Sequence, residues 1–253
     1  MRVLFENTHA IAVNKTTSLT SFHSLYQGHK GYFETIKDFL REQRHENEAV
    51  EYYPVHRLDA LTSGTLLIAK SKMAAKEMGL AFSESRVDKY YVAISDRKPS
   101  KKQGTIRGDL QKARRGSYKL LRQFENPSVT KFASVPLLHD KDHPGARAFL
   151  IKPITGKTHQ IRVAMKAIGS PIAGDGRYGN AVEAARSDRG YLHCAAIKIE
   201  LFDETIKIVC PPDEGSRFVQ DEFCSVFDGW FPKTYIDNND AWFVGHPLLE
   251  SRL

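Results

Sequence analysis

The chain has 253 residues, of which 41% are hydrophobic and 26% are charged, a composition that excludes a disordered or fibrous chain and permits a globular enzyme. Its formal net charge of +7 favours a polyanionic partner, because basic side chains neutralise phosphates and release counterions. The three cysteines, Cys194, Cys210 and Cys224, form no CxxC pair, which argues against a zinc ribbon and against the disulfide framework of a secreted protein. No segment reads as a signal peptide or reaches the length of a membrane span, so we expect a cytoplasmic protein.

The first third of the chain predicts a hairpin, a helix and a buried strand. Residues 3–14 form two short strands around a turn at residues 6–8. Apolar side chains recur at helical spacing over residues 32–44, which predicts an amphipathic helix. The apolar run 64–69 predicts a buried strand, and Ser71 supplies the N-cap of a helix that follows it.

The middle of the chain contains two further strands and a helix. Residues 88–95 alternate with period two, so Tyr90 and Tyr91 point to opposite faces of a strand. We expect only one of these tyrosines to belong to the core, and the other to face a cleft. Residues 146–154 predict a strand that runs through a turn into an amphipathic helix, and Gly169 is expected to end that helix.

The end of the chain predicts a strand pair and an irregular tail. Residues 191–209 alternate again and are expected to turn near residues 203–204. The tail after Phe223 is rich in aromatic residues without a clear period, so we expect irregular structure packed over the body.

The segment His56–Gly64, with the sequence HRLDALTSG, is the densest candidate for a functional site. It holds a carboxylate, Asp59, two residues after a guanidinium and just before the apolar strand. An isolated aspartate in such a place is ordinarily a turn residue that hydrogen-bonds its own backbone. Composition and spacing alone leave the two interpretations open.

The longer segment HRLDALTSGTLLIAKS resembles the signature of the RluA-type pseudouridine synthases, whose pattern is roughly HRLDxxTSGxLxxAK. Three more motifs resemble that family in the same order: KYYVA at 89–93, IKPITGKTHQIRV at 151–163 and GSPIAGDGRYG at 169–179. The resemblance covers about residues 11–218. It implies an α+β pseudouridine synthase fold, in which a long, mixed, mostly antiparallel sheet with flanking helices carries a central active-site cleft. We expect a single catalytic domain over residues 1–253, with a C-terminal extension at 224–253.

The resemblance also assigns roles to individual residues. It makes Asp59 the catalytic nucleophile or base, and it makes Arg57 the residue that enters the RNA. Tyr91 would hold the extruded uracil, and Arg162 would form a bidentate pair with Asp59 that keeps the carboxylate ionised. Further RNA contacts are expected from the motifs and from the basic stretch 97–119, namely from His56, Thr62, Lys89, Lys152, Lys157, His159, Arg114 and Arg115.

The function implied by the resemblance is the isomerisation of specific uridines in rRNA or tRNA to pseudouridine. This reaction needs neither a redox change nor an external group, so we expect no cofactor and no metal. Only two residues precede the first predicted strand, so we expect a monomeric, stand-alone catalytic body without the small S4-type RNA-binding domain. Asp59 could attack the ribose C1′, add to the base, or abstract the 2′ proton, and the sequence does not choose among them.

Other classes of protein fit the residues less well. A non-catalytic RNA-binding protein of the same fold fits the basic charge equally well but makes Asp59 dispensable. A methyltransferase or a zinc deaminase is disfavoured, because the chain has no glycine-rich nucleotide loop after a strand and no His-x-Glu with a paired CxxC. A nucleoside glycosidase would want a second catalytic carboxylate, and no other Asp or Glu stands in a matching motif.

Overall fold

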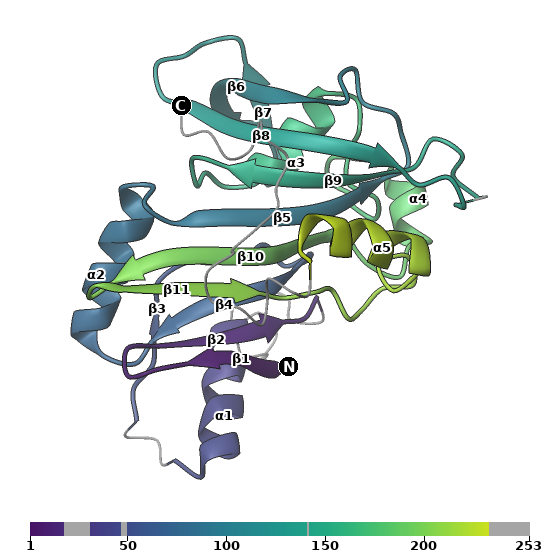
Figure 1. The fold of residues 1–253 in the computed structure, drawn as a ribbon. Helices are drawn as coiled ribbons and strands as arrows, with labels where there is room; N and C mark the ends of the chain where they lie inside the picture. Colours follow the sequence, from purple (N-terminus) through teal and green to yellow (C-terminus); the bar gives the residue numbers. More distant parts are fainter. Residues whose placement is uncertain (18–30, 47–49, 141, 233–253) are drawn as a thin grey trace.

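A computed structural model describes residues 1–17, 31–46, 50–140 and 142–232 of the chain. In these residues the strands form one 11-stranded sheet in the order β1-β2-β4-β10-β5-β9-β8-β6-β7, in which β11 also pairs with β10 and β3 with β4 (Figure 1). Every strand pair is antiparallel except β10 with β4. The fold is therefore α+β, built on a mixed and mostly antiparallel sheet.

The strands are β1 (Arg2–Glu6), β2 (Ala10–Lys15), β3 (Tyr53–Pro54), β4 (Thr62–Ala69), β5 (Asp88–Ser95), β6 (Gln103–Lys112), β7 (Tyr118–Leu121), β8 (Pro127–Pro136), β9 (Arg147–Pro153), β10 (Leu192–Leu201) and β11 (Glu204–Val209). The helices are α1 (Tyr32–Arg44), α2 (Lys72–Ser83), α3 (Gln160–Ala167), α4 (Ala181–Ala185) and α5 (Asp221–Trp230), with the short 3-10 helix η1 (Arg114–Gly116) between β6 and β7. Among the described residues, no helix is both long enough and apolar enough to cross a membrane.

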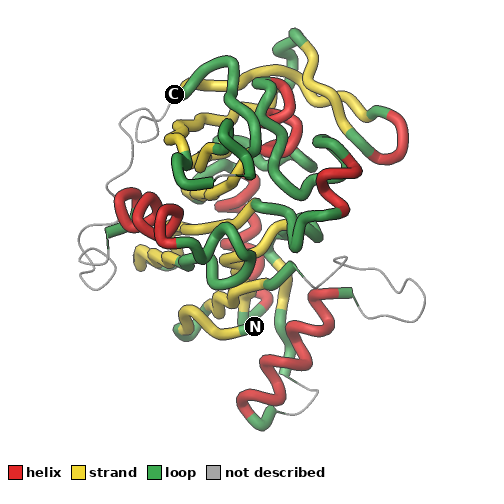
Figure 2. Tube along the Cα trace, turned by 90° about the vertical axis from the view of Figure 1, so that its right-hand side faces the viewer, coloured by secondary structure: helices red, strands yellow, loops and turns green. Residues whose placement is uncertain are grey.

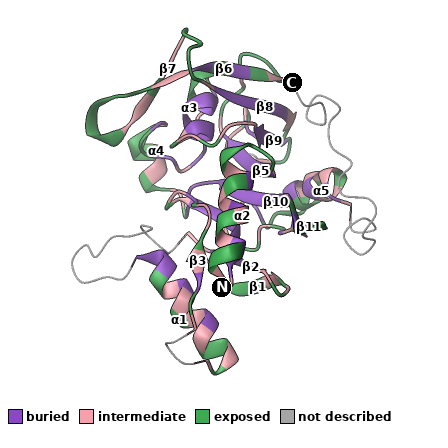
Figure 3. Cartoon of the chain, turned by 90° about the vertical axis from the view of Figure 1, so that its left-hand side faces the viewer, coloured by how far each residue is buried: buried purple, intermediate pink, exposed green. Residues whose placement is uncertain are grey.

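Helices cover both faces of the sheet, and this arrangement decides where a site can form. When the sheet is seen nearly edge-on, α5 lies on one side and α1, α3 and α4 lie on the other (Figure 3). The same separation is visible from the opposite edge in Figure 2. In the register of the sheet Tyr91 lies opposite Ile151 and Cys194, so these three side chains share the face on which α3 lies.

Most elements predicted from the sequence are confirmed. The N-terminal hairpin is β1 and β2, and the helix over 32–44 has the predicted bounds. Ser71 caps α2, because its hydroxyl accepts a hydrogen bond of 3.1 Å from the backbone N–H of Ala74. Gly169 follows α3 with a φ of 80°, as expected of the residue that ends a helix.

The expectation of an irregular tail after Phe223 is wrong for its first part, which is the helix α5. Phe223, Phe227 and Phe231 recur every fourth residue and are buried, so they form an apolar stripe of helical period. Asp221 and Glu222 in the first turn also favour a helix, because acidic side chains complement the positive end of its dipole. Residues 233–253, the remainder of the tail, lie outside the described residues.

The expectation that only one of the two β5 tyrosines is buried is also wrong. Tyr90 is 3% exposed and Tyr91 is 9% exposed. β5 lies in the middle of the sheet between β10 and β9, and its side chains are buried on both faces. Alternate side chains of β5 therefore lie in two different buried environments. One face of the strand belongs to the closed core, and the other forms part of the wall of a pocket.

Candidate active site

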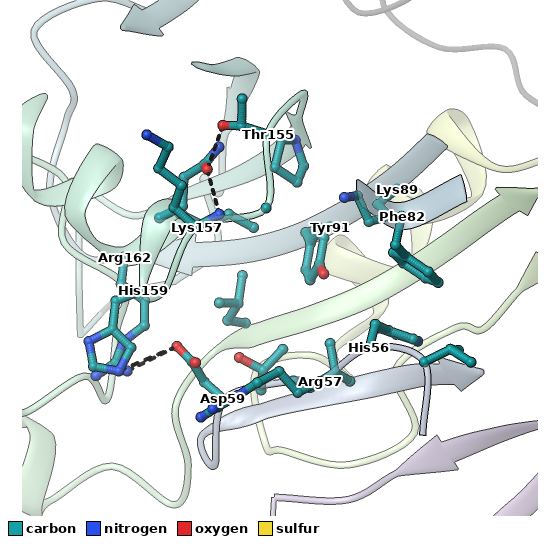
Figure 4. A pocket seen from close by; sticks show the side chains of 18 of the residues that line it. His56, Arg57, Asp59, Phe82, Lys89, Tyr91, Thr155, Lys157, His159 and Arg162 are labelled. Carbon is teal, nitrogen blue, oxygen red and sulfur yellow. Dashed lines mark hydrogen bonds and ion pairs between the residues drawn. The ribbon is translucent and has the colours of Figure 1, made fainter. Parts of the chain in front are cut away.

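A pocket of about 410 Å³ lies beside the start of β4, β5 and the loop before α3 (Figure 4). Most of the residues singled out in the sequence line it, although they come from separate parts of the chain. They are His56, Arg57, Asp59, Thr62, Lys89, Tyr91, Lys157, His159 and Arg162. The structure thus brings the predicted catalytic residues Asp59, Tyr91 and Arg162 into one cavity.

Asp59 stands in the turn that leads into β4, and backbone contacts hold this turn in place. The N–H of Thr62 donates to the carbonyl of Asp59 at 3.0 Å. Lys15 is fully buried beneath the turn, and its ammonium group donates to the carbonyls of Thr16, Ala60 and Thr62 at 2.9, 3.2 and 2.9 Å. The turn is therefore fixed by its main chain, which leaves the Asp59 side chain directed into the pocket.

Arg162 holds Asp59 through one hydrogen bond and holds Asp175 through two. Its Nη1 lies 3.1 Å from Oδ2 of Asp59, whereas its Nε and Nη2 lie 2.7 and 2.9 Å from the two oxygens of Asp175. Burial disfavours the Arg162 charge, but the bonds to Asp175 and Asp59 outweigh burial and raise the pKa of Arg162. The predicted bidentate Arg162–Asp59 pair is therefore wrong, because the fork of the guanidinium is already occupied by Asp175.

His159 lies on the other side of the Asp59 carboxylate, at the N-cap of α3. Its Nδ1 is 2.8 Å from the hydroxyl of Tyr178, and its Nε2 is 4.0 Å from Oδ2 of Asp59. Burial lowers the pKa of His159, although the charge of Asp59 acts in the opposite direction. The lowered pKa favours the neutral imidazole, whose contact with Asp59 is then a dipole contact and not an ion pair.

The far end of the pocket is aromatic and contains one amine (Figure 4). The ring of His56 stacks on Phe82 with centroids 4.6 Å apart, and its Nε2 accepts a hydrogen bond of 2.8 Å from the N–H of Leu67. Burial lowers the pKa of His56 to about 3 and raises the pKa of Tyr91 well above 10. Burial also lowers the pKa of Lys89, whose Nζ lies 5.7 Å from the Phe82 ring. A flat, uncharged ring system suits such a wall.

The rim of the pocket carries two of the predicted RNA-contacting cations. Arg57 is exposed, and it lines the pocket next to Asp59. Lys157 is half-buried, and its Nζ donates to the side-chain oxygen of Asn126 at 2.8 Å and also to the backbone carbonyl of that residue. Thr155 and the Lys157 N–H both donate to the side-chain oxygen of Gln160, which fixes the loop before α3.

Three predicted RNA-contacting residues lie outside the pocket. Lys152 is buried on the opposite face of the sheet, where its Nζ lies 2.8 Å from the Asp88 carboxylate and 3.0 Å from the Tyr90 hydroxyl. This position does not support an RNA contact by Lys152, because the side chain is enclosed and paired. Arg114 and Arg115 are exposed on η1, at the tip of the β6–β7 hairpin.

Three residues of the site received no role from the sequence. Asp175 and Tyr178 belong to the GSPIAGDGRYG motif, whose match with the family was the only available signal. Asp175 is 1% exposed, and Tyr178 packs its ring 4.9 Å from the guanidinium carbon of Arg162. Lys15 gave no signal, since a lysine at the end of a strand is ordinarily solvated. In the described part of the chain, no cluster of three or more His, Cys, Asp or Glu residues is arranged to hold a metal.

The arrangement suits a carboxylate that acts on a molecule with a flat, neutral ring. Asp59 has a fixed cation on one side and a neutral imidazole nearby, and it shares the cavity with the phenol of Tyr91. A carboxylate in this setting can act as a nucleophile or as a base.

Comparison with known proteins gives concordant matches. The family model described as RNA pseudouridylate synthase matches residues 10–167. An uncharacterized RNA pseudouridine synthase of Haemophilus influenzae is 38% identical over 220 residues, which cover 87% of this chain and 91% of that protein. The dual-specificity RNA pseudouridine synthase RluA of Escherichia coli K12 is 34% identical over 199 residues, 78% of this chain and 85% of that protein. The ribosomal large subunit pseudouridine synthase C of Rickettsia prowazekii is 32% identical over 193 residues, 76% of this chain and 60% of that protein.

Two solved human structures share the fold. Human RNA pseudouridylate synthase domain containing 1 has a TM-score of 0.67 and 24% identity, and the match covers 98% of this chain and 90% of that one. Human RNA pseudouridylate synthase domain containing 4 has a TM-score of 0.66 and 20% identity, and the match covers 85% and 89%.

Proposed function

The chain belongs to the RNA pseudouridylate synthase family and is an RluA-type RNA pseudouridine synthase, and from this premise we propose that Asp59 is its catalytic carboxylate. One observation carries the proposal. The Asp59 carboxylate lies inside the cavity that Tyr91 also lines, and a buried arginine donates to it at 3.1 Å. A convex, solvent-facing Asp59 would have removed the basis for this role.

The reaction breaks the bond from C1′ of the ribose to N1 of uracil and forms a bond from C1′ to C5. The C5 proton leaves to solvent and N1 takes up a proton, so no oxidant, reductant or cofactor enters the balance. Asp59 acts as the nucleophile or base, and Arg162 orients it and stabilises its negative charge. Tyr91, a protonated phenol, contacts the extruded base at the wall of the pocket.

Access of a uridine to this pocket requires that the base leave its stack. Arg57, exposed beside Asp59, occupies the space that the base vacates. Lys89 and Lys157 supply positive charge, while His56 and Thr62 contact the nucleotide from the pocket wall. Arg114 and Arg115, exposed on the β6–β7 hairpin, contact phosphates outside the pocket.

The RNA partner is a ribosomal RNA or a tRNA. The Rickettsia relative is named for the large ribosomal subunit, and the Escherichia coli relative is named as a dual-specificity enzyme. We also propose that the catalytic unit is a monomer and a single domain with its core over about residues 11–218. The single sheet that the described strands form supports one domain. α5, at the start of the extension 224–253, packs on that sheet against β9.

The test uses transcripts of large-subunit ribosomal RNA and of tRNAs that are labelled with tritium at C5 of uridine. Wild-type protein should release tritium to water from at least one transcript, and Asp59→Asn should lower the rate by more than about 10³-fold. Asp59→Asn should bind the same transcript with unchanged affinity, because Asn keeps the size of the side chain. An Asp59→Asn protein that retains more than a tenth of the wild-type rate would refute the role of Asp59.

A further inference from the structure

His159 occupies a place that the mechanism above does not use. It caps α3 with a φ of 56°, a left-handed conformation in which His, Asn and Asp are enriched among residues other than glycine. Its ring stands edge-on between Tyr118 and Tyr178, with centroid distances of 5.7 and 5.6 Å and interplanar angles of 82° and 84°. The backbone and the two rings together fix the direction of the imidazole.

The hydrogen bonds around Tyr178 are compatible with a His159 tautomer that carries its hydrogen on Nε2. The backbone N–H of Tyr118 donates to the Tyr178 oxygen at 2.9 Å. The Tyr178 oxygen has a second lone pair, so this bond alone leaves the direction of the next contact open. In the tautomer of His159 that carries its hydrogen on Nε2, the Tyr178 hydroxyl donates to Nδ1, 2.8 Å away. A neutral imidazole that accepts at Nδ1 carries its hydrogen on Nε2. This N–H faces Oδ2 of Asp59.

Two donors therefore converge on the same carboxylate oxygen. Nη1 of Arg162 lies 3.1 Å from Oδ2, and Nε2 of His159 lies 4.0 Å from it. In the part of the chain that the structure describes, no residue donates a hydrogen bond to Oδ1. Catalytic hydrogen bonds are often long without substrate and shorten in the reactive complex, so the His159 contact has room to close.

We propose that His159 is a positioning residue for the reaction, and that Tyr178 orients it so that its Nε2–H holds Oδ2 of Asp59 and turns Oδ1 toward the substrate. This inference rests on the proposed role of Asp59. It replaces the direct RNA contact expected of His159 from the sequence, because only 16% of the side chain is exposed and both ring nitrogens face protein groups.

The two roles predict different kinetic effects. A residue that binds RNA affects the dissociation constant, whereas a residue that orients Asp59 affects the rate of the bound complex. His159→Asn tolerates the left-handed backbone and can still accept from Tyr178, but its amide is too short to reach Asp59. His159→Gln has an N–H donor at about the reach of Nε2. Tyr178→Phe keeps His159 and removes the hydroxyl that orients it.

The experiment measures the single-turnover rate of tritium release at saturating protein, and RNA binding in parallel, on a transcript that wild-type protein modifies. His159→Asn and Tyr178→Phe should each lower the rate at least about tenfold, the size expected of one hydrogen bond to a charged group, with the dissociation constant changed less than twofold. The double variant should be no slower than the slower single variant, because both changes remove one interaction. His159→Gln should recover the rate to within about threefold of wild type.

Three results would overturn the inference. These are a His159→Asn protein with the wild-type rate, a loss expressed mainly in the dissociation constant, and a double variant whose loss is the product of the two single losses. Circular dichroism and the urea midpoint of each variant identify a loss that comes from unfolding, and the Gln variant tests the donor in a folded protein. If Asp59→Asn remains active, the proposed function fails; if only the His159 variants keep full rate, the further inference alone fails.

Discussion

Two buried polar clusters lie on opposite faces of the sheet at the start of β4, and they differ in one respect. On the α5 face, Arg189 donates to the Ser63 hydroxyl at 2.5 Å, Ser63 contacts Nδ1 of His193 at 2.7 Å, and Nε2 of His193 lies 2.7 Å from the carbonyl of Cys210. This series of hydrogen bonds ends at a backbone carbonyl, and the ring of Phe218 packs against its His193 and Arg189 side chains. We call it the closed cluster.

The second cluster consists of Arg162, Asp175, His159, Tyr178 and Asp59, and we call it the open cluster. Arg162 donates two hydrogen bonds to Asp175 and one to Asp59, and Tyr178 links His159 to the backbone of Tyr118. The Asp59 carboxylate is the last group of the open cluster, and it lines the pocket. Polar networks that are fully satisfied stabilise and specify a fold, whereas one acceptor left facing a cavity is available for chemistry. Four predictions test this division.

The largest effect is expected from Asp175→Asn, which removes the buried countercharge of Arg162. The guanidinium keeps its enclosed position but loses its countercharge and one of its two bonds to residue 175, because an amide has only one acceptor oxygen, so the free energy of unfolding should fall by about 3 kcal/mol. The rate should also fall by about 10²-fold, because Arg162 no longer has a fixed orientation at Asp59. Urea unfolding and tritium release measure the two effects. Asp221→Asn, at an exposed position of α5, is the control. It should change the free energy of unfolding and the activation free energy each by less than about 0.5 kcal/mol.

A loss of stability in Asp175→Asn without a loss of rate would contradict the division. In that case the Arg162–Asp175 pair would support the fold only, and the contact of Arg162 with Asp59 would not depend on it.

Ser63→Ala cuts the closed cluster in its middle and should produce the opposite pattern. It leaves a donor of Arg189 and Nδ1 of His193 without their buried partner, so the free energy of unfolding should fall by about 2 kcal/mol. The rate per folded molecule should stay within about threefold of wild type, because the Ser63 hydroxyl contacts Arg189 and His193 and does not line the pocket. Urea unfolding at equilibrium, with activity measured well below the transition, separates the two quantities. Ser100→Ala, at an exposed serine, serves as the matched control.

Lys15→Met tests the support beneath both clusters, because Lys15 binds the carbonyls of Ala60 and Thr62 between Asp59 and Ser63. Burial lowers the pKa of Lys15 from 10.5 to about 7. Between these values the unfolded chain holds a proton that the folded chain has lost, so the contribution of Lys15 to stability rises with pH across this window. Well below pH 7 both states are largely protonated, and the contribution is constant.

The measurement is urea unfolding of wild-type protein and of Lys15→Met at pH 7, 8 and 9. The difference between wild type and variant should rise in favour of wild type by about 2 kcal/mol over this range. Lys76→Met, at an exposed lysine of α2, should show no such rise. A constant difference for Lys15→Met would mean that the three carbonyls keep the amine charged in the folded protein.

The sequence predicted elements whose signal is local and missed contacts between distant residues. The stripe of Phe33, Ile36 and Leu40 suffices to place α1, and the alternation of 88–95 suffices to place β5. The partner of Arg162 could not be read in this way, because Asp59 is 103 residues away and Asp175 is 13 residues away in another motif. Either carboxylate could pair with the guanidinium of Arg162. Only the packing of the folded chain decides which aspartate forms the bidentate pair.

Local sequence patterns also could not predict which side chains become buried when other parts of the fold pack against a strand. Tyr90 and Tyr91 alternate correctly along β5, yet both are buried, because β5 is a central strand whose side chains are enclosed on both faces. Lys152 carries a positive charge within a family motif, but its place in the strand register puts it on the face opposite Tyr91. Motif membership thus identified the site as a whole, whereas the face of the sheet decided which members of each motif reach it.

The smallest effect is expected from a matched pair of lysine substitutions, Lys157→Met and Lys152→Met, which compares the two faces directly. Lys157 lines the pocket rim, so its loss should weaken RNA binding about fivefold and reduce the slope of log affinity against log salt by about one. Lys152 is enclosed with Asp88 and Tyr90, so its loss should lower the free energy of unfolding and leave the salt slope unchanged. Filter binding over a salt series with one transcript measures both slopes. If the salt slope fell equally in the two variants, RNA would contact both faces of the sheet. The division into an open and a closed face would then not describe RNA binding.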